Sequence, residues 1–69
     1  MNRLRDVRED HDLKQVDIAK ILQTTKQQIC RWETGKQMMG VDKYIKLAIY
    51  YNISVDYLLG LIDEPRKLY

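Results

Sequence analysis

Apolar residues recur at helical spacing along almost all of this 69-residue chain, and no segment alternates between apolar and polar residues as a half-buried strand does. The spacing predicts five short helices, over residues 2–11, 15–22, 26–34, 41–51 and 55–59. A chain of about this size buries only ~60% of the surface that it exposes when unfolded, so its core is thin and has no room for a large enclosed active site. We therefore predict an all-α protein, a compact five-helix bundle with one shared core.

Each predicted helix carries an apolar face that we expect to pack into this core. In the loop before the fourth helix, Met38 and Met39 are expected to pack onto the bundle. The expected core residues of the first four helices are Leu4 and Val7; Ile18, Ala19, Ile21 and Leu22, with Val16 assisting; Ile29 and Trp32; and Val41, Tyr44, Ile45, Ala48 and Tyr51.

The link between the second and third helices is the sequence QTT, at residues 23–25. A connection of three residues is typical of a helix-turn-helix. Ala19 is small and lies one turn before the end of the second helix, so the two helices can cross closely. Thr25 is a good N-cap for the third helix, with Gln28 at the matching position of a reciprocal capping box. Gly35 is expected to end that helix.

Composition excludes several classes of protein. The single cysteine, Cys30, rules out an intramolecular disulfide. The first ten residues, MNRLRDVRED, lack the apolar segment of a signal peptide, and no apolar run approaches the ~18 residues of a membrane span, so we expect a cytoplasmic protein. No cysteine or carboxylate is spaced from His11 in a way that suggests a zinc site, and no nucleophile is matched with a base. We expect no enzyme, no metal or cofactor site, and no small-molecule ligand.

The third predicted helix is unusually polar for a chain with so thin a core. On a helical wheel Ile29 and Trp32 fall together and are expected to face the core, with Glu33 on the inward flank. The net charge of +2 and the sequence pI of about 8.8 are only mildly basic, so the position of the cations matters more than their number. The outward side holds Lys26, Gln27, Cys30, Arg31 and Thr34.

These outward groups suit the edges of base pairs. Glutamine can bond bidentately to adenine, arginine or lysine can do so to guanine, and small groups can contact a thymine methyl. One good bidentate pair contributes ~1–3 kcal/mol of discrimination between bases. A solvated helix face would also be polar, but this one contains no acid, and its long donors cluster in the N-terminal half of the helix. The side therefore indicates recognition of double-stranded DNA.

Two stretches, LKQVDIAKILQTTKQQICRWETGK and IKLAIYYNISVDYLLG, resemble the helix-turn-helix DNA-binding domain of the Cro and phage-repressor type, known as the Xre family. The resemblance extends from about Arg3 to Gly60. It implies a lambda-repressor-like five-helix domain, here residues 1–62, that binds DNA as a two-fold symmetric homodimer. Helix 26–34 would lie in the major groove. Residues 63–69 would form a short charged tail, which we expect to be poorly ordered.

The resemblance also implies roles for individual residues. It places Lys26, Gln27 and Arg31 where the family reads bases, with Cys30 beside them. Residues at family positions for phosphate contacts are Gln15, which would also brace the recognition helix, Thr24, Thr34 and Lys36. Arg8 and Glu33 match a family ion pair between the first and third helices.

The chain departs from the family pattern at two places that affect these roles. The second helix usually begins with a hydroxyl cap, and Lys14 occupies that position. Loss of such a cap costs ~0.5–2 kcal/mol. The loop after the third helix is usually basic, whereas KQMMG has one cation. Each phosphate contact adds roughly 0.9 to the salt slope for duplex DNA, so we expect a shallow slope.

Ile49 and Tyr50 lie outside the predicted buried stripe of the fourth helix. Either they cover edges of the core or they form a dimer interface, together with Val55, Leu59 and Leu61. The expected function is a sequence-specific transcriptional regulator, a repressor, that binds a near-palindromic operator with half-sites ~10–10.5 bp apart. The alternative is an antitoxin-like or anti-repressor module that uses the same fold to bind a protein partner.

Overall fold

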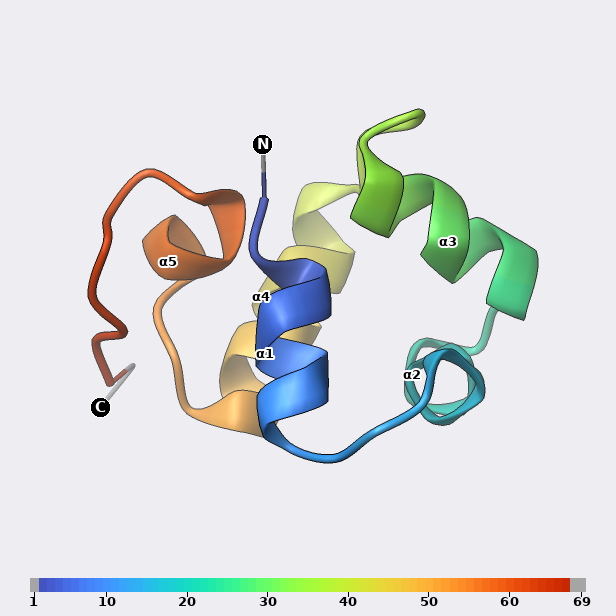
Figure 1. The fold of residues 1–69 in the computed structure, drawn as a ribbon, viewed down its shortest axis with the longest axis horizontal. Helices are drawn as coiled ribbons and strands as arrows, with labels where there is room; N and C mark the ends of the chain where they lie inside the picture. The colour runs from blue at the N-terminus through green and yellow to red at the C-terminus, as the bar shows by residue number, and fades with distance from the viewer. Residues whose placement is uncertain (1, 68–69) are drawn as a thin grey trace.

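The computed structural model describes residues 2–67 and has five helices and no strand in that range. The molecule measures 28 × 21 × 20 Å. Figure 1 shows α2 and α3 at one end of the long axis and α5 at the other, with α1 and α4 between them. The prediction of an all-α five-helix bundle is therefore confirmed. The helices are α1 (Leu4–Asp10), α2 (Gln15–Leu22), α3 (Lys26–Thr34), α4 (Val41–Tyr51) and α5 (Val55–Leu59).

One apolar cluster joins all five helices, and every residue in it is less than a tenth exposed. Leu22 in α2 and Leu58 in α5 are completely buried. α2 packs chiefly against α3, while α5 packs against α4 and α1. The cluster consists of Leu4, Val7, Ile18, Ala19, Leu22, Ile29, Trp32, Met39, Tyr44, Leu47, Ala48, Tyr51 and Leu58.

The first helix begins at Leu4 and ends at Asp10, so the predicted range of 2–11 was too long. The side chain of Asn2 accounts for the late start. Its Oδ1 accepts a hydrogen bond from the backbone N–H of Leu4 at 3.1 Å, and its Nδ2 donates to the carbonyl of Trp32 at 2.9 Å. Asn2 thus connects the start of α1 to the end of α3 from outside the helix.

The third helix has the predicted N-cap and C-terminal glycine. Thr25 accepts from the N–H of Gln28 at 3.2 Å, and Gly35 follows the helix with φ +79°. The reciprocal half of the capping box was wrong. The Gln28 side chain reaches the loop after the helix, where its Nε2 donates to Oε1 of Gln37 at 2.7 Å. The N–H of Gln37 donates to the carbonyl of Arg31, which brings the loop back alongside α3.

The buried face of α4 differs from the prediction. Val41 and Ile45 were expected in the core but are 72% and 48% exposed, and Leu47 is buried in their place. The buried positions 44, 47, 48 and 51 centre about 110° around the helix from position 45, because successive residues turn by ~100°. Apolar residues on the flank of α4 therefore remain at the surface.

Two smaller expectations for the core were also revised. Val16 is 43% exposed, so α2 contacts the core through the buried Ile18, Ala19 and Leu22 and the partly buried Ile21, without Val16. In the loop before α4, Met39 is buried but Met38 is 82% exposed.

The C-terminal segment contacts the body of the protein at two points. Asp63 pairs with Arg3 at 3.2 Å, and the carbonyl of Arg66 accepts from the N–H of Ser54 at 2.7 Å. Leu68 and Tyr69, the last part of the predicted tail, lie outside the described residues. Within residues 2–67, no helix is long and apolar enough to cross a membrane.

Candidate nucleic-acid interface

The outward side of α3 presents a row of polar side chains that have no hydrogen-bond or ion-pair partner within residues 2–67. Ile29 and Trp32 hold the opposite side of the helix in the core, at 2% and 8% exposure. Within residues 2–67, the side chains of Lys26, Gln27 and Arg31 make no hydrogen bond or ion pair with the rest of the chain. We call the following exposed residues the recognition face: Lys26, Gln27, Cys30 and Arg31.

A buried ion pair fixes the end of α3 against α1. Arg8 Nε donates to Glu33 Oε2 at 2.7 Å and Arg8 Nη2 donates to Glu33 Oε1 at 3.1 Å, so the contact is bidentate. Arg8 Nη1 also donates to the carbonyl of Leu13 at 2.9 Å. The two charged side chains are only 11% and 4% exposed. This hydrogen bonding to Glu33 raises the pKa of the Arg8 guanidinium above its usual value, against the opposing effect of desolvation.

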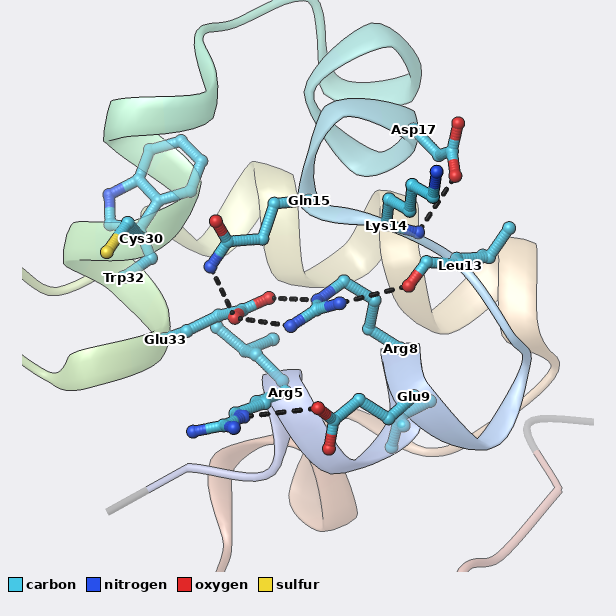
Figure 2. Close-up of polar contacts among 12 residues, drawn as sticks. Arg5, Arg8, Glu9, Leu13, Lys14, Gln15, Asp17, Cys30, Trp32 and Glu33 are labelled. Atoms are coloured by element: carbon cyan, nitrogen blue, oxygen red, sulfur yellow. Dashed lines mark hydrogen bonds and ion pairs between the residues drawn. The ribbon is translucent and has the colours of Figure 1, made fainter.

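Gln15, the first residue of α2, joins the same cluster. Its Nε2 donates to Glu33 Oε1 at 3.0 Å. Figure 2 shows the side chains of Arg8 and Gln15 pointing toward Glu33, so that α1, α2 and α3 meet at one carboxylate. The charge of Glu33 is therefore compensated inside the protein, and the carboxylate offers little repulsion to a phosphate outside it.

The N-terminal ends of α2 and α3 border an open cleft that contains two lysines. Lys14 and Lys26 line it together with Arg8, Gln15 and Val16. From the sequence, Lys14 was noted only because it occupies the position of the usual hydroxyl cap. It was not predicted to contact DNA. Its position directly before α2 is the signal that could have found it. The carboxylate of Asp17 supplies the other half of a capping box, accepting from the Lys14 N–H at 2.8 Å (Figure 2).

The other predicted phosphate contacts lie near the two ends of α3. Thr24 is half-buried in the turn, where its N–H donates to the carbonyl of Ala19 at 2.8 Å. Lys36 is exposed just beyond the helix. Thr34 is exposed, but its hydroxyl donates to the carbonyl of Cys30 at 2.9 Å. Donation from Thr34 to a phosphate would require that hydroxyl to rotate away from the helix.

The five residues predicted for a dimer interface differ in their exposure. Ile49, Tyr50 and Leu61 are 54%, 51% and 72% exposed, and the ring of Tyr50 meets Tyr51 edge-on at 5.2 Å between centroids. Leu61 lines an open groove with Met38, Gly35 and Leu59. The predicted residues Val55 and Leu59 are partly buried against the core.

Comparisons with known proteins agree with this architecture. A family profile described as a helix-turn-helix matches residues 4–58. The uncharacterised HTH-type transcriptional regulator YobD of Bacillus subtilis (strain 168) is 36% identical over 63 residues, which cover 91% of this chain and 56% of that protein. The crystal structure of a transcriptional regulator from Listeria innocua matches with a TM-score of 0.81 at 29% identity, over 90% of this chain and 58% of that one. This chain thus spans a little more than half the length of each relative.

Proposed function

The chain belongs to the helix-turn-helix family, and on that premise we propose that it is a sequence-specific DNA-binding repressor of transcription. It acts in the cytoplasm, as a homodimer on a near-palindromic operator, with α3 in the major groove. A small domain that covers an operator blocks access to that DNA without a second activity, which favours repression over activation.

The observation that carries this proposal is the contrast between the two sides of α3. One side is fixed by Ile29, Trp32 and the buried Arg8–Glu33 pair, while the recognition face makes no polar side-chain contact within the described chain. A rigid helix with uncommitted donors is what direct contact with base edges requires, because each bidentate pair depends on close positioning. Gln27 would contact adenine, and Lys26 and Arg31 would contact guanine. Cys30 is small enough to lie against a thymine methyl.

Phosphate contacts would flank this face on both sides. At the start of α2 and in the turn, we propose Gln15 and Thr24, joined by Lys14 from the cleft. At the far end of α3, Lys36 and, after rotation of its hydroxyl, Thr34 would bind the next phosphates. Contacts to phosphates set the position of a protein on the duplex, whereas contacts to bases set the sequence preference.

Selection from a random pool of duplex DNA, run at two salt concentrations, tests the proposal. We expect a two-fold motif whose half-sites lie ~10–10.5 bp apart and whose affinity falls with added salt. Gln27→Ala and Arg31→Ala should change or relax the preferred bases, whereas Lys36→Ala should weaken binding evenly on all sequences. Lys67→Ala removes the same charge from the tail and serves as the control.

Three results would count against this proposal. If no two-fold motif emerges, the proposed function is wrong. If Lys36→Ala changes the preferred bases, the assignment of Lys36 to a phosphate contact is wrong. If the protein instead co-purifies with a partner and shows no salt-sensitive DNA binding, the alternative of an antitoxin-like or anti-repressor module is favoured.

A further inference from the structure

A stripe of three apolar residues runs along the solvent side of α4. Val41, Ile45 and Ile49 follow one another at intervals of four residues, so they lie one above the other on the helix surface. They are 72%, 48% and 54% exposed, although β-branched aliphatic residues are usually buried. We call these three residues the α4 stripe. A polar flank would suffice if this side of the helix faced only water.

The α4 stripe points away from α2. On the opposite side of α4, Lys43 Nζ donates to the carbonyl of Leu22 at 3.3 Å, which places that side against the end of α2. Lys43 lies about 160° around the helix from Ile45, because successive residues turn by ~100°. A molecule bound to the stripe would therefore leave α2 and the recognition face uncovered.

Two opposite charges border the stripe on one side. Asp42 and Lys46 are both exposed and four residues apart. Neither has an ion-pair partner within residues 2–67, and they do not pair with each other. The stripe thus combines apolar side chains with one acidic and one basic group that are both available to a partner.

We propose that a second copy of this chain covers the α4 stripe, with the two α4 helices antiparallel about a two-fold axis at Ile45. The inference rests on the proposed homodimer and identifies its surface. The surface of a two-fold interface must be complementary to itself. The α4 stripe meets this requirement. Ile45 meets its own symmetry mate, and Val41 meets Ile49 of the other copy.

The charges satisfy the same symmetry. A helix rises by about 1.5 Å per residue, so Asp42 lies about 4.5 Å along α4 from the two-fold axis at Ile45. Lys46 of the other copy lies about 1.5 Å along the helix from the same two-fold axis, on the same side of it. Asp42 of each copy therefore faces Lys46 of the other, and the pair occurs twice. Of the five residues predicted for the interface from the sequence, only Ile49 belongs to this surface.

Sedimentation equilibrium of the purified chain without DNA, over a range of protein concentrations, provides the first test. We expect a reversible dimer for the unmodified chain and an increase in its Kd of roughly 100-fold or more for Ile45→Lys, as for a residue at the centre of an interface. Leu61→Lys is the matched control, since Leu61 is exposed in the separate groove beside Met38. Circular dichroism shows whether each variant is folded.

Charge reversal provides the second test. Asp42→Lys and Lys46→Asp each set like charges opposite one another twice, and each should raise the dimer Kd by about three- to thirty-fold. The double variant Asp42→Lys/Lys46→Asp should return the Kd close to its original value. An ion pair within one chain would change the melting temperature and leave the Kd unaltered, which would overturn the proposed pairing.

The remaining outcomes also decide the proposal. A chain that stays monomeric at all concentrations overturns it, as does a dimer that is lost with Leu61→Lys but retained with Ile45→Lys. These results are independent of the DNA selection, since a monomer can still select a half-site through α3. Failure of this interface is therefore distinguishable from failure of the DNA-binding function.

Discussion

Glu33→Gln removes the negative charge on which the side chains of Arg8 and Gln15 converge. The side chain of Arg8 is only 11% exposed, and its charge would lose the carboxylate that pairs with it. Removing one partner of a buried pair costs about 3–5 kcal/mol, and the lower end applies here because the glutamine oxygen still accepts one hydrogen bond. A domain of this length has a total stability of roughly 3–10 kcal/mol, so the loss should remove a large part of that stability.

Urea unfolding followed by circular dichroism measures this loss by linear extrapolation. The control is Glu9→Gln, which neutralises a glutamate that is 54% exposed and pairs with Arg5 at 3.3 Å. An exposed pair of this kind contributes ~0.2–1 kcal/mol. The double variant Arg8→Met/Glu33→Met removes both charges and should be more stable than Glu33→Gln. If Glu33→Gln costs no more than Glu9→Gln, the pair between Arg8 and Glu33 does not stabilise the end of α3.

Three further predictions concern alkaline pH and helix ends. Burial raises the pKa of Tyr51 to about 12. In the unfolded chain the tyrosine pKa is near ~10, so the unfolded state releases this proton at a lower pH than the folded state does. The free energy of unfolding should therefore fall by about 2–3 kcal/mol between pH ~10 and ~12. In urea titrations, Tyr51→Phe should remove that part of the loss. Gln23 ends α2 at φ +56°, so Gln23→Gly should stabilise the protein by about 0.5–1 kcal/mol in thermal unfolding. Gly35→Ala should destabilise it by about 1 kcal/mol through backbone strain alone, since nothing lies within 4 Å of the added Cβ; an unchanged melting temperature would contradict this.

The bounds of α3 and α5 could be predicted because local signals and packing agree at their ends. Thr25 and Ser54 cap α3 and α5 through their hydroxyls, and Gly35 and Gly60 follow those helices in the left-handed conformation. The start of α1 could not be found in this way. It depends on the hydrogen bond from Asn2 to Trp32, thirty residues away, which no local pattern contains.

The buried face of α4 shows a second limit. Apolar residues occupy so much of this helix that the periodicity permits more than one buried stripe. The choice of Leu47 over Val41 and Ile45 is made by the packing of the other helices, which a helical wheel does not represent. Val41 and Ile45, the two residues wrongly placed in the core, form the α4 stripe together with Ile49.

For the candidate interface, the residue types on α3 could be predicted, but their hydrogen bonding could not. The outward direction of Gln27 and Arg31 follows from the inward phase of Ile29 and Trp32. The bond from Gln28 to Gln37 depends on the course of the loop after α3. The cleft position of Lys14 likewise depends on how α2 meets α3.

The bond between Gln28 and Gln37 also bears on the rate at which DNA is bound. It attaches the loop to α3, together with the backbone bond from Gln37 to Arg31. The backbone at Lys36, between Gly35 and Gln37, is therefore held alongside α3 before any duplex arrives. No slow rearrangement of this loop has to precede docking, so association should proceed in a single phase, at a rate set by diffusion and orientation in the range of ~10⁵–10⁷ M⁻¹s⁻¹.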